Sequence, residues 1–310
     1  MPTSTSITTT YSGQFAGQYI SAALLSGDTI AKGGLTVKPN IKFKEVIKRV
    51  ELDGIVKDQT CDFTDTSTLT LTERILQPEF LQVNLELCKS DFESDWEAIQ
   101  MGYSAFDVLP KNFVDYFIAY NSAKVAEWIE QKIWTGTTAS AGEFNGFQAL
   151  LAADSTVIDV TAVTAGVSSS NVLAELGKVV DAIPTDLFGK EDLYIYIPTN
   201  VMKAYVRALG GFGASGLGAA GVDAKGSTWF NNQELMFEGI KLFHAPGLGS
   251  NKMVAGQKSN LYFGCGLLSD QNECKVLDMS DLDGSKNVRF IMRMTAGVQF
   301  GVGADLVYYA

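Results

Sequence analysis

Histidine is nearly absent from this sequence, which has a single one, His244, among 310 residues. No Ser-His-Asp triad or Cys-His dyad could be built without it. It stands in the segment IKLFHAPG, at the expected end of a strand before a turn, where a structural or surface histidine is the plainer interpretation. Walker A, HExxH and GxSxG patterns are also missing. We therefore expect no catalytic residue, no cofactor and no metal site.

Cysteine is scarce, and long apolar runs are missing. Cys61, Cys88, Cys265 and Cys274 show no two-residue spacing, which excludes zinc knuckles and leaves free thiols as the expectation. No run of 18 or more apolar residues occurs, so no membrane span is predicted. Residues 1–31 contain no Lys or Arg, and therefore no charged start of a secretory signal. We expect the chain to stay in the cytosol.

Basic residues are few: 24 Lys and Arg stand against 35 Asp and Glu, a net charge of −11. A protein that grips nucleic-acid phosphates needs a basic face, so we expect any nearby DNA to be held weakly and without specificity. Hydrophobic residues make up 46% and charged residues 19%, as in ordinary globular domains. The composition thus predicts a folded protein whose main partner is not nucleic acid.

The first forty residues are rich in Ser, Thr and Gly, as in TSTSITTTYSGQ, and such a composition rarely builds its own core. Ordering the backbone of residues 1–31 costs roughly 30 to 60 kcal/mol. Their large apolar side chains return only about 16 kcal/mol when buried. We therefore expect residues 1–31 to be ordered only by other copies of the chain. The contacting side chains would include Ile7, Tyr11, Phe15 and Tyr19.

Residues 41–88 read as strands. The segment IKFKEVIKRVELDGIVK fits either a helical face or a strand, and we favour the strand. Leu69 and Leu71 then alternate with threonines, and residues 83–88 alternate in the same way. Together, residues 41–88 are predicted to form an extended hairpin. Leu69 and Leu71 have little local core, so we expect them to pack on a neighbouring copy.

A long helix and a long strand are also predicted. The helix opens at Pro110 and runs to Thr135, with apolar residues recurring at spacings of three, four and seven. Such a helix is about 37 Å long. From Phe290 to Val302 every second residue is apolar, which is the strongest strand pattern in the chain. These two elements predict an elongated body.

Between them lies a mixed region, with a helix near Val172–Val180, a buried strand LYIYI and a helix after Pro198. A glycine-dense loop follows, at 208–227. Within it, Gly211 to Gly216 match the dinucleotide pattern GxGxxG, but that pattern needs a strand before it and a helix after it. Here a helix precedes and more loop follows, so we predict a flexible loop.

This order of parts resembles the major capsid proteins of tailed bacteriophages, which have the α+β Hong Kong 97 type fold. The segment TLTLTERILQPEFLQVNLELCKSDFESDWEAIQMG looks most like capsid proteins of phages that infect Bacteroidetes. The resemblance implies these parts: N-arm 1–40, E-loop hairpin 41–89, P-domain 90–149 with spine helix 110–135, A-domain 150–270 with its glycine-rich loop, return to the P-domain strand 271–303, and C-terminal end 304–310.

The resemblance further implies a subunit that assembles into hexamers and pentamers of an icosahedral head around double-stranded DNA. Its partners would be copies of itself, a portal, a separate scaffold and, in some relatives, decoration proteins, with assembly in the host cytoplasm and a final place in the virion capsid. Some relatives crosslink Lys to Asn between subunits; Lys57 could be a donor, but no acceptor matches. The expected inter-subunit contacts are Ile7, Tyr11, Phe15, Tyr19, Lys57, Leu69 and Leu71.

Two other functions stay open at this point. An encapsulin, a bacterial compartment shell, shares the fold but encloses protein cargo, so the content of purified particles would distinguish it. An α/β nucleotide-dependent enzyme built around the glycine-rich loop is the second. A nucleotide-induced thermal shift would favour that reading.

Overall fold

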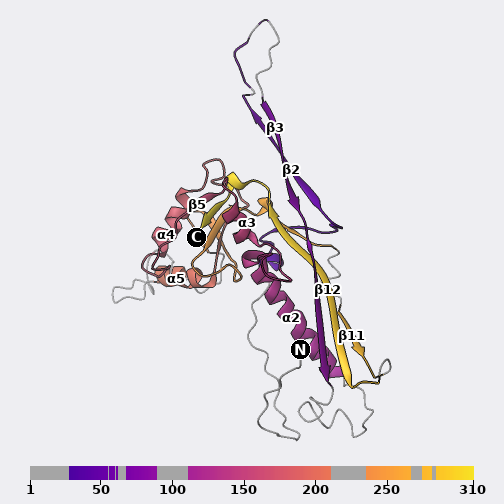
Figure 1. Ribbon diagram of the computed structural model, residues 1–310. Helices are drawn as coiled ribbons and strands as arrows, with labels where there is room; N and C mark the ends of the chain where they lie inside the picture. Colours follow the sequence, from indigo (N-terminus) through magenta and orange to yellow (C-terminus); the bar gives the residue numbers. More distant parts are fainter. Residues whose placement is uncertain are drawn as a thin grey trace.

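The chain forms a compact lobe and an elongated lobe, and a two-stranded hairpin projects away from both (Figure 1). The computed structural model describes residues 28–54, 56–59, 61, 68–88, 111–210, 235–266, 274–280 and 284–310. The glycine-rich loop from Gly211 onward and the arm residues before Asp28 lie outside these ranges.

The compact lobe is built on a six-stranded sheet with the order β5-β13-β9-β6-β8-β7. Its strands are β5 (Ile158–Val160), β6 (Leu193–Ile197), β7 (Met236–Phe237), β8 (Ile240–His244), β9 (Met253–Gln257) and β13 (Val307–Tyr309). Two helices, α4 (Val172–Asp181) and α5 (Thr199–Gly210), pack on one face. The predicted helices and the LYIYI strand are confirmed here.

Alternation along β6 shows how this sheet serves two cores. Leu193, Ile195 and Ile197 pack with α4 and α5, whereas Tyr196 points to the opposite core and is fully buried there. Successive strand residues face opposite sides, so a strand covered on both sides must be apolar throughout. The run LYIYI meets that requirement.

The elongated lobe combines a sheet with the long helix. Its strands are β1 (Thr36–Lys38), β10 (Leu261–Gly264), β12 (Asn287–Phe300) and β11 (Cys274–Asp278), in that order, with β4 (Glu79–Cys88) paired to β12 as well. The helices are α1 (Asp28–Ala31), α2 (Lys111–Thr135) and α3 (Phe147–Ala153), and short 3-10 turns lie at Lys258–Asn260 and Gly303–Asp305. The predicted long helix and the predicted long strand are both confirmed.

Strand β12 buries every second side chain against this core, as its alternation predicts. The buried apolar residues are Val288, Phe290, Met292, Met294, Ala296, Val298 and Phe300. The strand ends at Phe300, so Val302, the last member of the predicted pattern, lies beyond it. A long strand with one buried face needs a long partner, and α2 supplies one through Val125, Ile129 and Ile133.

The hairpin is shorter than predicted. Strands β2 (Glu45–Asp53) and β3 (Thr68–Leu76) pair over their whole length, but β4 leaves them and pairs with β12 from Glu79↔Ala296 to Cys88↔Asn287. The chain passes from the hairpin to the central sheet at Gln77 and Pro78, which pack closely against Gly297. Only glycine fits there, because a Cβ at position 297 would lie 2.8 Å from the Gln77 carbonyl oxygen. A single hairpin over 41–89 is therefore wrong in its second half, because β4 buries Leu81 in the central core instead.

Residues 28–38 belong to the folded body, which corrects the expectation that residues 1–31 are ordered only by other copies. The Thr29 backbone N–H donates to Glu130 Oε2 at 3.1 Å, and Trp134 Nε1 donates to Thr29 Oγ1 at 3.2 Å. Further along, the Tyr196 hydroxyl donates to the Gly34 carbonyl oxygen at 2.6 Å. These buried polar contacts, which composition did not reveal, tie Thr29 to α2 and Gly34 to β6. The question of a partner surface remains for residues 1–27 alone.

Candidate interaction surface

The projecting hairpin carries an apolar face that its own chain leaves exposed. Residues directly opposite each other in an antiparallel pair point to the same side of the ribbon. The register places three apolar pairs on one side: Val46 with Ile75, Val50 with Leu71, and Leu52 with Leu69. Their exposed fractions run from 43% at Val46 to 68% at Leu71.

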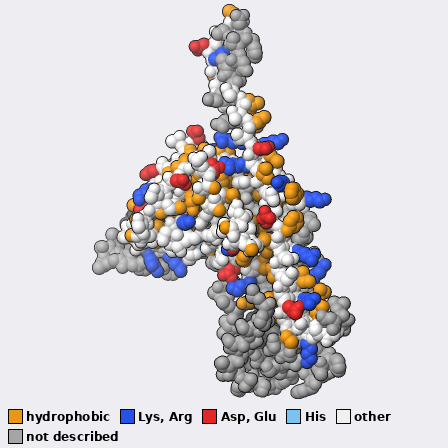
Figure 2. All heavy atoms as spheres, in the orientation of Figure 1, with side chains coloured by type: hydrophobic (Ala, Val, Ile, Leu, Met, Phe, Trp, Pro, Cys, Tyr) orange, Lys and Arg blue, Asp and Glu red, His pale blue; other side chains and the backbone are white. Residues whose placement is uncertain are grey.

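The other face of the ribbon is more polar: Arg49 lies opposite Thr72, and Ile47 lies opposite Arg74. Figure 2 shows hydrophobic side chains along the projecting stem. On the apolar side, the pair Lys48 with Glu73 separates Val46 and Ile75 from the other four apolar residues. A two-stranded hairpin is at best marginally stable in water by itself, and exposed apolar residues gathered on one side are typical of a protein-protein contact. We call these six apolar residues the hairpin face.

The structure places the predicted contact residues unevenly. Leu69 and Leu71 lie on the hairpin face, as expected of exposed apolar residues. Lys57 lies beyond the end of β2 toward the hairpin tip and is exposed. The four arm residues, Ile7, Tyr11, Phe15 and Tyr19, lie outside the described residues.

Sequence reasoning missed four of the six residues of the hairpin face: Ile75 on β3 and all three on β2. Val46, Val50 and Leu52 occupy alternate positions with Lys48 between them, which is a strand signal. Lys48 interrupts that alternation of apolar residues. Val46, Ile47 and Val50 also fit a helical spacing, and this second pattern obscured the strand signal. Only the pairing with β3 shows that these residues share one side.

The root of the hairpin is fixed by polar contacts. Arg74, near the end of β3, donates from Nη2 to Asp154 Oδ2 and from Nε to the Gly301 carbonyl oxygen at 2.8 Å. Its guanidinium also lies over the Phe300 ring, 4.3 Å from the ring centre. Partial burial alone would raise the pKa of Asp154, but hydrogen bonds from Thr156 and Arg74 outweigh it and hold that pKa below its usual range. Asp154 is therefore kept ionised opposite the arginine.

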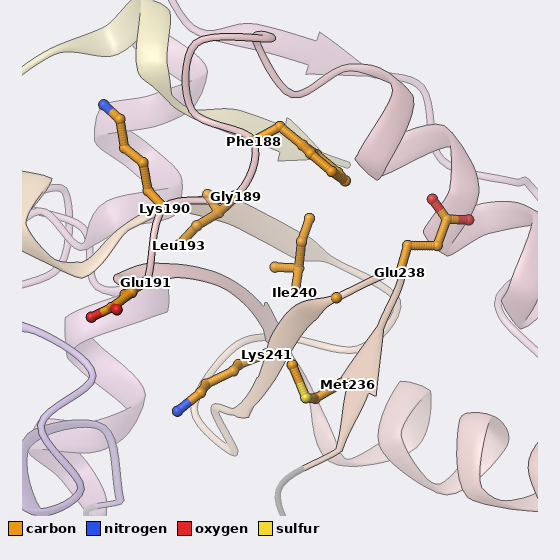
Figure 3. Close-up of a pocket in the computed structure, with 10 residues that line it drawn as sticks. Phe188, Gly189, Lys190, Glu191, Leu193, Met236, Glu238, Ile240 and Lys241 are labelled. Atoms are coloured by element: carbon orange, nitrogen blue, oxygen red, sulfur yellow. The ribbon is translucent and has the colours of Figure 1, made fainter.

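A second surface feature is a pocket of about 480 Å³ at one end of the compact lobe. Phe188, from the loop after α4, lies above Ile240 of β8, with Met236 nearby and Lys190 and Glu191 at the rim (Figure 3). Phe188 is 54% exposed. The lining combines apolar side chains with the charged residues Glu238 and Lys241.

Within the described ranges, no group of three or more His, Cys, Asp or Glu side chains could hold a metal ion. His244 lies with Nε2 2.9 Å from the Thr199 hydroxyl, at the start of α5. Among the helices that the structure describes, none is long and apolar enough to cross a membrane.

Comparison with known proteins gives similarity in structure but not in sequence. No protein-family model matches the chain, and no curated protein matches it. The capsid of an empty GTA particle matches with a TM-score of 0.61 at 12% identity, over 94% of this chain and 92% of that one. The capsid of Myoviridae phage XM1 gives 0.58 at 12% identity, over 94% of each chain, and a chain of Mycobacterium phage Adephagia gives 0.60 at 13%, over 98% and 94%. The chain therefore has the α+β Hong Kong 97 type fold of phage capsid proteins over nearly its whole length.

Proposed function

We propose that this chain is a major capsid protein, a subunit that assembles with copies of itself into the icosahedral head of a tailed bacteriophage around double-stranded DNA. The observation that carries the proposal is the hairpin face on a chain with a capsid fold. Six apolar side chains that are about half exposed would each contribute about 1 kcal/mol when a partner covers them. Hexamers and pentamers are the assemblies in which neighbouring copies would cover them.

The hairpin and the two lobes correspond to the parts of a capsid subunit. We assign β2 and β3 as the E-loop, α2 with β4 and β12 as the P-domain, and the six-stranded sheet with its helices as the A-domain. Residues 1–27 would form the arm that lies on neighbouring copies through Ile7, Tyr11, Phe15 and Tyr19. Deleting 1–27 should impair assembly more than folding, because the anchoring contacts of Thr29 remain in the shortened chain.

The remaining parts of the proposal concern partners and setting. A portal and a separate scaffold would take part in assembly in the host cytoplasm, and decoration proteins could bind the finished virion capsid. The chain would be most like the capsid proteins of phages that infect Bacteroidetes. Packaged DNA would touch the shell only weakly, since the chain has a net charge of −11. No enzymatic role is proposed, because the similar solved structures are capsid proteins.

The decisive experiment is electron microscopy of the purified chain, expressed alone and with its scaffold. Closed shells of uniform diameter are the expected result. Soluble monomers in both preparations, with no shell at any protein concentration, would overturn the proposal. Shells that enclose a protein cargo and no DNA in their natural source would instead identify an encapsulin compartment.

A further inference from the structure

The hairpin leaves the body at a root where both strands make charged contacts. On β2, Glu45 accepts from Lys38 of β1, and Glu45 lies directly opposite Leu76 of β3. On β3, Arg74 reaches in the other direction, toward Asp154 at the end of α3 and the Gly301 carbonyl oxygen just after β12. The two strands are thus tied to different parts of the body.

Arg74 fixes β3 to the body more firmly than Glu45 fixes β2, because three different groups surround the Arg74 guanidinium. One edge donates to a carboxylate, another donates to a backbone carbonyl, and the plane lies over the buried Phe300 ring. A planar guanidinium with fixed donors restricts direction as well as distance. Lysine could supply the charge but not this combination.

The acceptor is itself held in place. Asp154 Oδ1 accepts from the Thr156 backbone N–H at 2.8 Å and from the Thr156 hydroxyl at 2.7 Å, which leaves Oδ2 for Arg74. The side chains of Arg74 and Asp154 are 28% and 18% exposed. A partly buried, pre-oriented acceptor loses little freedom when the arginine binds, so the contact is more effective than an exposed surface pair.

We propose that Arg74 is the positioning residue of the hairpin: its contacts with Asp154, Gly301 and Phe300 set the angle at which β2 and β3 leave the body. The consequence for the shell rests on the proposed capsid function. Nine residues of strand at about 3.3 Å each reach about 30 Å from the root, so a swing of about 10° moves the tip by about 5 Å. An error of that size would misplace the hairpin face on a neighbouring copy.

The test measures the hairpin angle in unassembled subunits, before any shell forms. Spin labels at Val56→Cys in the hairpin and Lys203→Cys on α5 report their distance by pulsed electron resonance, in a chain whose native cysteines are replaced by alanine. Both sites are exposed. Arg74→Gln should broaden the distance distribution, with about a tenfold rise in the ratio of detached to anchored hairpins, as expected for the loss of a charge-assisted contact.

Matched variants separate positioning from general loss of charge. Arg289→Gln removes an arginine whose Nε lies 2.7 Å from Glu86 on the neighbouring strand β4, away from the root, and should leave the distribution unchanged. Asp154→Asn should broaden it as Arg74→Gln does, and Arg74→Lys should fall between. If Arg74→Gln does not fold, Asp154→Asn carries the test alone. An unchanged distribution in the folded variant would overturn the proposal.

Shell diameter is a second measurement, independent of the spin-label distance. If Arg74 positions the hairpin, shells of Arg74→Gln should vary in diameter, while Arg289→Gln should give the wild-type diameter. Uniform shells from Arg74→Gln would show that the neighbouring copies, and not Arg74, set the angle. Failure of the wild-type chain to form shells would refute the proposed function, but the distance measurement would still decide the role of Arg74.

Discussion

The hairpin and the six-stranded sheet use similar strands for opposite purposes. In the compact lobe, β6 buries Leu193, Ile195 and Ile197 under its own helices and Tyr196 on the other side. In the hairpin, Leu69 and Leu71 stand on a strand with no covering layer and stay more than half exposed. Apolar strands alone do not distinguish folding from assembly. What distinguishes them is whether the same chain supplies the second layer.

The largest expected effect comes from placing charges on the hairpin face. Changing Leu69 and Leu71 together to Asp should abolish closed shells while soluble subunits persist, because burying two unpaired carboxylates costs on the order of several kcal/mol per interface. Electron microscopy counts the shells, and circular dichroism checks the fold of the subunits. The matched control is Thr70→Asp with Thr72→Asp, which adds the same charges to the opposite, polar face of the same strand. Equal shell yields from the two double variants would contradict a role for the hairpin face.

The next effect compares one leucine in each region. Leu176 of α4 is fully buried, so Leu176→Ala should lower the free energy of unfolding of the unassembled subunit by about 2–5 kcal/mol. Leu71 is 68% exposed, and Leu71→Ala should change it by less than about 0.5 kcal/mol. Urea unfolding of monomeric subunits measures both. A large loss in Leu71→Ala would show that the hairpin face is covered within the subunit.

A smaller effect is expected in the pH dependence of the stability of the compact lobe. Burial is the main reason that the pKa of Tyr309 is raised to about 12, and its hydrogen bond to Glu175 at 2.7 Å adds to the shift. An unfolded tyrosine titrates near pH 10, so the stabilisation from neutral Tyr309 is complete below about pH 10 and is lost as the pH rises toward 12. Tyr309→Phe should therefore flatten the fall in stability over that interval.

The neighbouring residue provides the control for this titration. Tyr308→Phe removes a hydroxyl that accepts from Lys252 and should leave the slope near the wild-type value. Some slope will remain in Tyr309→Phe, because burial also raises the pKa of Tyr196. Denaturant unfolding at several pH values between about 9 and 12 measures the difference. Identical slopes in the two variants would show that Tyr309 ionises freely in the folded lobe.

Elements with a continuous pattern could be predicted from the sequence. The alternation through β12 runs along the whole strand, and apolar residues recur at helical spacing in both halves of α2 although Asn121 and Ser122 interrupt the stripe, so their period identifies both elements. The helix after Pro198 was predicted for a similar reason, since proline marks its start. In each case the information is local to the element.

Pairing partners could not be predicted in the same way. Strand β4 follows β3 after only Gln77 and Pro78, which reads as a continued hairpin, yet it pairs with β12 about two hundred residues later. The docking of Thr29 on Glu130 and Trp134 likewise joins distant residues through hydrogen bonds that leave no periodic trace. Four of the six residues of the hairpin face were missed because the face depends on register, and a register belongs to two strands together.

The smallest expected effect concerns charge and tests whether the exposed hairpin is a nucleic-acid contact instead of a protein contact. Between residues 42 and 76 the sequence has six basic residues and seven acidic ones, so the hairpin is nearly neutral while the whole chain has a net charge of −11. Binding that neutralises Z phosphates gives a slope of about −0.9Z in a plot of log affinity against log salt. We expect a slope indistinguishable from zero for duplex DNA, measured by fluorescence anisotropy with unassembled subunits. A slope of about −4 or steeper, lost on changing Lys48 and Arg49 to Gln, would show that the hairpin binds phosphates. The hairpin face would then need a different explanation from packing on a second copy.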